Sequence, residues 1–131
     1  MTTDSLITLH RYYIWANKLR ADFQNILKNK NKISKAGYEI ESLMYMSLWY
    51  GMLYVVIEGW QNLKLKDEVI DSLLKSKYTN LLKRYRNGVF HFQKKYKDER
   101  FDDLDKEKDA VEWIVDLNKE LGRFFLEKLK N

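Results

Sequence analysis

Apolar residues recur along most of this chain at the spacing of one helix face, which predicts an all-α fold. The first such stretch covers residues 4–28, where apolar side chains lie mostly three, four or seven residues apart. They are Leu6, Leu9, Tyr13, Ala16, Phe23 and Ile26. Polar and basic residues from Lys28 to Lys32 suit the negative end of a helix dipole and end the stretch. We therefore predict a first long helix over residues 4–28.

The second helical stretch, residues 38–63, is almost continuously apolar. Its uncharged run from Ser42 to Ile57 spans 16 residues between Glu41 and Glu58. A membrane span needs roughly 20 apolar residues, so we expect no membrane segment. A helix that is apolar all round must be covered on every side, and one small chain can cover only part of it. We therefore expect this helix to build a homodimer interface.

The remaining pattern predicts one short helix and two longer ones. Residues 64–77 fit a short connecting helix, and residues 80–96 fit a third long helix. Residues 98–108 are dense in charge and lack an apolar period, which predicts an exposed loop. The last helix should begin near Asp105 to Asp109, whose carboxylates suit a helix N-terminus. The fold class we expect is an all-α, up-and-down bundle of four main helices plus one short connecting helix, in a single domain over residues 1–131.

The amino-acid composition excludes some kinds of chemistry and favours some kinds of partner. The chain of 131 residues has no Pro, which removes a common marker of turns, and no Cys, which excludes disulfides and thiolate chemistry. Its N-terminus lacks the basic start and apolar segment of an export signal, so we expect a cytoplasmic protein. The net charge of +5 favours polyanionic partners. The Met and aromatic residues of the apolar stretch are interpreted as core or interface residues, and we expect no cofactor.

Unlike polar groups gather in residues 81–92. The residues spaced to face a core there are Leu81, Tyr85, Gly88, Val89 and Phe92. Arg86, Asn87 and His91 are left off that face. Arg86 and His91 lie roughly 140° apart around an ideal helix, so one straight helix cannot aim both at one small target. Either the helix is deformed at a glycine within this stretch, or a second copy of the chain completes the site.

The segment from Arg86 to His91 resembles the R-x4-6-H motif of the HEPN superfamily (higher eukaryotes and prokaryotes nucleotide-binding), in which a polar residue such as Asn often follows the Arg. The resemblance covers six residues in motif and, in helical architecture, the whole chain. It implies a small, dimeric helical bundle and a metal-independent endoribonuclease, such as a toxin or defence protein. It also admits a protein partner or an antitoxin.

RNA cleavage asks little of the protein. The 2′-OH of RNA can attack the adjacent phosphate, so no metal and no side-chain nucleophile is needed. His91 is the candidate for proton transfer, Arg86 for stabilising charge on the phosphate, and Asn87 for a hydrogen bond to the phosphate or to the imidazole. No spacing typical of metal ligands occurs, and His10 is interpreted as a partly buried or surface residue.

Other residues have supporting roles in this hypothesis. Glu58, at the end of the apolar run, should pair with Arg86, orient His91 or remain a solvated charge. Arg84, Lys94 and Lys95 make the same end of the molecule basic and are candidates for contacts with RNA phosphates. A solvated helix tail would explain those charges equally well.

One residue departs from a pattern within the family. HEPN toxins that are paired with a minimal nucleotidyltransferase antitoxin resemble R-x4-6-H-x-Y, whereas Gln93 stands at the Tyr position here. That particular partnership is therefore in doubt. The alternative function is a non-catalytic helical module that binds RNA or another protein.

Overall fold

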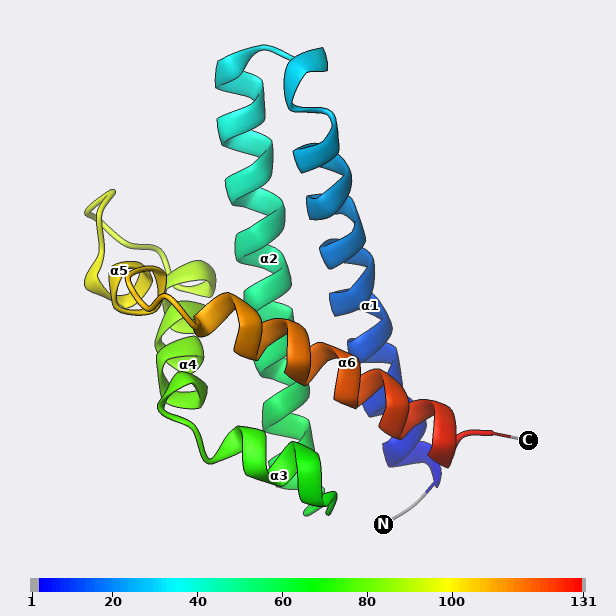
Figure 1. Cartoon of the computed structure of the whole chain (residues 1–131). Helices are drawn as coiled ribbons and strands as arrows, with labels where there is room; N and C mark the ends of the chain where they lie inside the picture. Colours follow the sequence, from blue (N-terminus) through cyan, green and yellow to red (C-terminus); the bar gives the residue numbers. More distant parts are fainter. Residues whose placement is uncertain (1–2, 131) are drawn as a thin grey trace.

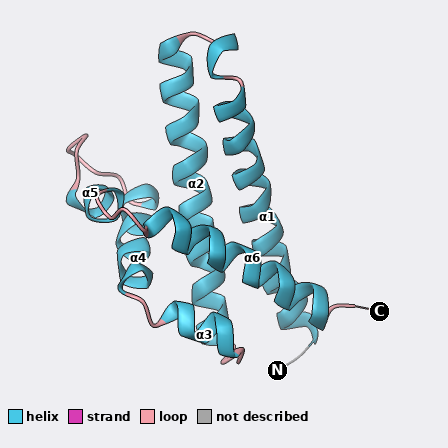
Figure 2. Cartoon of the chain, in the orientation of Figure 1, coloured by secondary structure: helices cyan, strands magenta, loops and turns pink. Residues whose placement is uncertain are grey.

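The computed structural model describes residues 3–130 and contains only helices and connecting segments in that range. Figures 1 and 2 show the order of the elements along the chain. They are α1 (Thr3–Lys28), η1 (Lys30–Lys32, a 3₁₀ turn), α2 (Lys35–Asn62), α3 (Glu68–Leu74), α4 (Lys77–Phe90), α5 (Glu99–Asp105) and α6 (Ala110–Lys128). The predicted all-α bundle is confirmed.

The two longest helices, α1 and α2, run antiparallel and form a hairpin (Figure 1). The hydroxyl of Ser34 accepts a hydrogen bond from the N–H of Gly37 at 3.1 Å and so caps the start of α2. The end of the hairpin that carries this turn projects beyond the other helices. Apolar side chains of α2 in this half are exposed, including Ile40, Leu43 and Met44.

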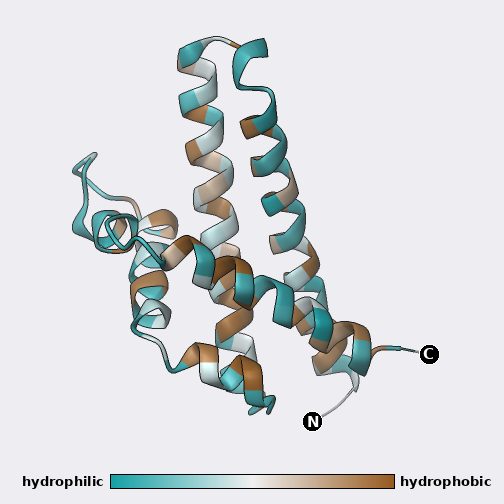
Figure 3. Ribbon diagram, viewed as in Figure 1, coloured by the Kyte–Doolittle hydropathy of each residue, from teal (hydrophilic) through white to brown (hydrophobic). Residues whose placement is uncertain are grey.

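The hydrophobic core surrounds the C-terminal half of α2. Leu53, Val56 and Ile57 are at most 1% exposed, and α6 adds the fully buried Ile114 and Leu117. Helix α6 crosses the hairpin in this lower half of the molecule, where Figure 3 shows large hydrophobic segments. One chain therefore covers the C-terminal half of α2. Only its N-terminal half is left open for the predicted partner.

Helix α2 is also the described helix that is long and apolar enough to cross a membrane. The core helix of a bundle has the same composition, and the C-terminal half of α2 is buried as a core helix is. The absence of a membrane segment therefore stays a prediction.

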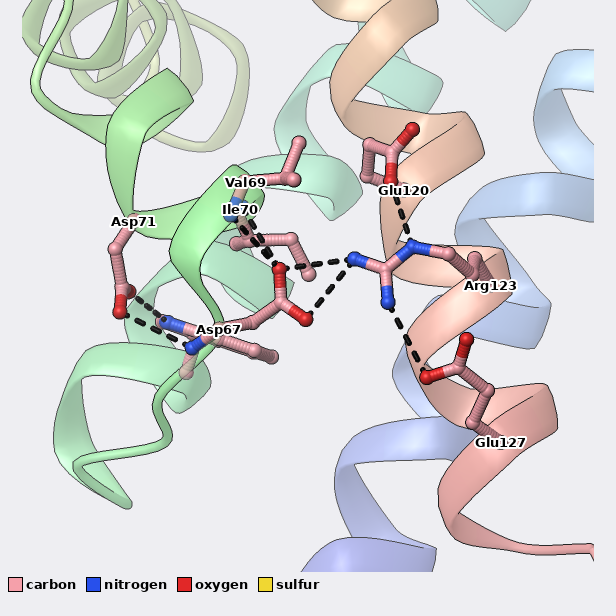
Figure 4. Close-up of polar contacts among 8 residues, drawn as sticks. Asp67, Val69, Ile70, Asp71, Glu120, Arg123 and Glu127 are labelled. Carbon is pink, nitrogen blue, oxygen red and sulfur yellow. Dashed lines mark hydrogen bonds and ion pairs between the residues drawn. The ribbon is translucent and has the colours of Figure 1, made fainter.

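Charged residues close the corner between α3 and α6 (Figure 4). Asp67 caps α3 by accepting hydrogen bonds from the N–H groups of Val69 and Ile70, at 3.1 and 3.0 Å. The same carboxylate accepts two bonds of 2.9 Å from Nη2 of Arg123 on α6. Asp71, one turn along, accepts a bond from the indole N–H of Trp60. These contacts hold α3 between the end of α2 and the C-terminal half of α6.

Helix α4 differs from the prediction at both ends. It begins at Lys77, because the Ser76 hydroxyl accepts a hydrogen bond from the N–H of Tyr78 and caps the helix three residues earlier than expected. It ends at Phe90, whereas the pattern predicted a helix to residue 96. The apolar period that includes Phe92 was misleading, since Phe92 lies outside the helix and is 92% exposed. The prediction that Phe92 faces the core was wrong.

The prediction of an exposed loop over residues 98–108 was also wrong, because α5 occupies most of it. Asp98 caps this helix by accepting a hydrogen bond from the N–H of Arg100 at 2.9 Å. Phe101 and Leu104, one turn apart, give α5 an apolar face, and Leu104 is 1% exposed. Two apolar residues are enough because α5 docks on α4, whose Gly88 leaves room for the Phe101 ring. The last helix, α6, begins where it was predicted.

Candidate functional site

His91 lies at the point where the chain leaves α4. Its backbone is extended, and its N–H donates to the carbonyl of Asn87 at 3.1 Å, which closes the last turn of the helix. The residue is exposed and begins the connection that covers residues 91–98. The Gln93 side chain donates to the carbonyl of His91 at 2.6 Å and stabilises the backbone just after the helix. The imidazole is thus held at a helix end and faces solvent.

Gly88 does not deform the helix. Helix α4 continues through Gly88 to Phe90, and no described glycine has a positive φ. A Cβ at Gly88 would lie only 2.8 Å from the ring of Phe101, so a glycine here lets α5 approach closely. Of the two routes that the sequence left open, the deformed helix is removed, and completion by a second copy remains.

Arg86 points towards α2 and has a partner at every guanidinium nitrogen. Nη1 and Nη2 each donate to the carboxylate of Glu58 at 3.2 Å, and Nε donates to Oδ1 of Asn87 at 2.9 Å. The guanidinium also lies over the ring of Tyr54, 4.9 Å from its centroid. The side chain is 16% exposed. Of the three roles considered for Glu58, the structure shows the pairing with Arg86.

The ion pair between Arg86 and Glu58 influences the neighbouring phenol of Tyr54. Burial raises the pKa of the Tyr54 phenol, and the nearby Glu58 carboxylate raises it further, while the Arg86 guanidinium opposes both. Tyr54 therefore stays protonated and serves Arg86 as a neutral aromatic surface. The Glu58 side chain is 53% exposed, so this ion pair is open to solvent on the carboxylate side.

A polar hollow of about 540 Å³ lies beside His91, between the end of α4 and α5. Its lining consists of two arginines, one imidazole, two amides and one aromatic ring: Arg84, Arg100, His91, Asn87, Gln93 and Phe92. The structure therefore brings His91 and Asn87 together. Arg86 lies behind Asn87 and reaches the hollow only through that hydrogen bond.

Of the three predicted RNA contacts, Arg84 lines this hollow, whereas Lys94 and Lys95 do not. Arg84 lines it and is also paired with Asp103 of α5 through Nη2 at 2.8 Å. Lys94 and Lys95 are exposed on the connection after α4. Lys95 faces a second hollow of about 460 Å³, which His91 also lines. His91 thus stands between two recesses of the surface.

Sequence reasoning missed Arg100, which lines the same hollow as His91. Arg100 stands on α5, and the charged run that contains it was interpreted as a loop. The spacing of Phe101 and Leu104 was the one signal that could have revealed this helix.

His10 and possible metal ligands lie apart from this site. The His10 ring is half-buried, 5.0 Å from the ring of Phe125, which agrees with its interpretation as a partly buried residue. Within residues 3–130, no group of three His, Asp or Glu side chains is arranged to hold a metal ion.

Comparison with known proteins gives no family for this chain. No family model, no curated protein and no solved structure matches it. The resemblance to the HEPN superfamily therefore rests on the motif from Arg86 to His91 and on the helical architecture.

Proposed function

We propose that this chain is a metal-independent endoribonuclease of the HEPN type that cleaves single-stranded RNA. One observation carries the proposal: the exposed imidazole of His91 shares a hollow with Asn87 and two arginines. Histidine can accept and donate protons near neutral pH, and the cations can stabilise charge on a phosphate. Such an enzyme would suit a cytoplasmic toxin or defence protein.

The reaction needs only groups that the RNA, this hollow and water supply. His91 removes the proton of the ribose 2′-OH as the 2′-oxygen attacks the adjacent phosphorus. The bond from phosphorus to the 5′-oxygen breaks, and that oxygen takes a proton from a water molecule as it leaves. The products are a 2′,3′-cyclic phosphate and a 5′-OH end. A cation beside the phosphate stabilises the charge that develops on its oxygens.

We propose that Arg86 acts in a homodimer. In one chain its guanidinium is held by Glu58 and Asn87, so it contributes positive charge behind Asn87. The exposed Leu43 of α2 lines the 460 Å³ hollow together with His91. A second copy packed on this half of α2 would therefore lie beside His91 and could bring its own Arg86 towards the cleft.

The proposal is tested by product analysis in EDTA. We expect the wild type to cut single-stranded RNA and to leave a 2′,3′-cyclic phosphate. The His91→Ala variant should lose about 10²- to 10⁴-fold in rate. Its melting temperature should be unchanged because the side chain is exposed. Cutting that needs Mg²⁺, acts equally on DNA or survives His91→Ala would contradict the proposal.

Arg86 needs a matched pair of variants, because its side chain is packed on Tyr54 and is not free of the fold. Arg86→Ala should abolish cutting and also lower stability by about 1 kcal/mol. Arg86→Lys keeps the charge but loses the planar fork, so cutting should be partly restored. Cutting by both variants at the wild-type rate would remove Arg86 from the mechanism.

The homodimer is tested by sedimentation at micromolar protein. We expect a dimer whose dissociation depends on concentration. Ile40→Glu and Met44→Glu, on the exposed half of α2, should shift the protein to monomer without unfolding it. A wild type that stays monomeric at every concentration would remove the shared site.

A non-catalytic RNA-binding or protein-interaction module is the second candidate. The engagement of every Arg86 nitrogen within one chain favours it, because such an arginine has no free fork for a phosphate. This candidate predicts binding that weakens steeply with salt and yields no product. Unchanged binding by His91→Ala, with no cutting by the wild type, would select it.

A further inference from the structure

Two arginines from different helices meet in the hollow beside His91. Arg84 comes from α4 and Arg100 from α5, and their side chains are 41% and 40% exposed. No carboxylate is among the residues that line this hollow. The charged side chains that line it are therefore cationic, while their carboxylate partners Asp103 and Asp98 lie outside the lining, and the amides of Asn87 and Gln93 add neutral donors. Such a surface suits an anion with several acceptor oxygens.

Both arginines are only partly engaged. Arg84 donates to Asp103 through Nη2, and its Nε is buried without a hydrogen-bond partner, so Nη1 is the nitrogen left for a ligand. The Nε of Arg100 lies 3.7 Å from Asp98, which is longer than a hydrogen bond. In each case the carboxylate fixes the position of the guanidinium and leaves donors for a ligand. The planar fork of Arg100 can bind the two non-bridging oxygens of one phosphodiester, and Nη1 of Arg84 can add a further hydrogen bond.

An aromatic ring borders the same hollow. Phe92 is 92% exposed, and nothing in the described chain covers it. An exposed ring next to a cationic surface is the arrangement on which proteins stack the bases of single-stranded nucleic acid. A base in a duplex is already stacked and paired, so the ring favours an unpaired strand.

We infer that Arg84 and Arg100 form a phosphodiester-binding subsite for single-stranded RNA, with a neighbouring base stacked on Phe92. This inference rests on the proposed function for the choice of RNA as ligand. It adds residues that hold the strand beside His91 and that take no part in the proton transfers.

The test is equilibrium binding of a fluorescent 2′-O-methyl RNA of about twelve nucleotides, which cannot be cut because it lacks the 2′-OH. Arg84→Gln and Arg100→Gln should each weaken binding roughly tenfold, since each removes charge-assisted hydrogen bonds. Each should also reduce the slope of log K against log salt by about 0.7. Arg84→Lys keeps a positive charge near Asp103, so it should fold like the wild type. Its affinity for the RNA should lie between those of the wild type and Arg84→Gln.

Matched controls separate this subsite from general charge. Arg11→Gln removes the same charge from α1, where Arg11 lies over Trp15, and should change binding less than twofold. Phe92→Ala should weaken binding roughly fivefold, whereas Phe92→Leu, which keeps apolar bulk but loses the ring face, should weaken it nearly as much. An abasic strand should bind the wild type as weakly as the normal strand binds Phe92→Ala.

The outcomes distinguish this inference from the proposed enzyme. If Arg84→Gln and Arg100→Gln bind like the wild type while His91 is needed for cutting, the subsite is wrong and the enzyme stands. If the three residues control binding but no RNA is ever cut, the subsite stands and catalysis fails. Equal competition by free inorganic phosphate, or tighter binding of a phosphoserine peptide than of RNA, would overturn the RNA subsite.

Discussion

Two corners of this molecule use arginine to join neighbouring helices, and they differ in how completely the arginine is engaged. Between α3 and α6, every nitrogen of Arg123 donates to a carboxylate, at distances of 2.7 to 3.3 Å (Figure 4). Between α4 and α5, Arg84 is held at one nitrogen and Arg100 at none within hydrogen-bond distance. An arginine whose donors are all used holds the fold together. An arginine with donors to spare can bind a ligand.

Arg86 shows why a sequence motif alone does not decide between these roles. Its three nitrogens are engaged by Glu58 and Asn87, so in one chain it resembles the structural Arg123. It differs because its acceptor Asn87 lines the hollow beside His91. Arg86 can therefore fix the amide of Asn87 for a ligand even while its own fork is occupied.

The largest effect on stability should come from filling the space at Gly88, where α5 packs on α4. Gly88→Leu would push a side chain into Phe101, which lies 2.8 Å from the position of a Cβ. We expect a loss of about 3 kcal/mol, because overpacking must displace α5. Urea denaturation measures this loss. Gly88→Ala, the smaller change, should cost less, and a Gly88→Leu variant as stable as the wild type would show that the Phe101 ring moves aside freely.

A somewhat smaller loss of stability should follow from breaking the contacts between α3 and α6. Asp67→Ala removes the cap of α3 and both bonds to Arg123, so we expect a loss of about 2 kcal/mol. Asp67→Asn keeps a capping oxygen but loses the charge, so about 1 kcal/mol should be lost. Thermal denaturation compares the two variants. At a temperature where both variants are folded, the rate of RNA cutting should equal that of the wild type. A loss of cutting would mean that the contacts of Asp67 affect the site beside His91.

The contribution of Asp67 should depend on pH in one direction. Burial tends to raise the pKa of Asp67, but the hydrogen bonds from the Ile70 N–H and from Arg123 outweigh it and hold the pKa below its ordinary value of 3.8. A lowered folded pKa gives stability that is complete above that ordinary value and is lost as the pH falls through the folded pKa. The difference in melting temperature between the wild type and Asp67→Asn should therefore shrink below pH 3.8. A difference that stays constant or grows in acid would contradict this assignment.

The smallest effect should come from Phe92. The apolar period of the sequence predicted a core position, for which truncation would cost about 3 kcal/mol or more. Because Phe92 is 92% exposed, we expect Phe92→Ser to change the free energy of unfolding by less than about 0.5 kcal/mol. A large loss of stability would mean that a second copy or another segment covers this ring in solution.

The sequence predicted the long helices well because their apolar periods extend over many turns. The end of α4 was misjudged because Phe92 continues the period of Val89, although the backbone leaves the helix at His91. Helix α5 was missed because its stability comes from contact with Gly88 on α4, which no local pattern of charged residues reveals.

The sequence predicted only part of the candidate site, because the rest depends on contacts between helices. Local sequence named Arg86, Asn87 and His91, and pairing of Glu58 with Arg86 was one of the roles expected. The hollow itself depends on α5, which supplies Arg100. A residue brought into the site by a helix that sequence reasoning missed could not be recognised as part of the site.

The most direct test of cleavage uses a DNA oligonucleotide that contains one ribonucleotide, incubated with the wild type in EDTA. Attack by a 2′-OH can occur only at that nucleotide, so we expect a single cut immediately 3′ of it and a 2′,3′-cyclic phosphate end. The His91→Ala variant should make this cut about 10²- to 10⁴-fold more slowly. A cut at any deoxynucleotide, a 3′-OH end or an equal rate with His91→Ala would contradict cleavage by the RNA hydroxyl with His91 as proton carrier.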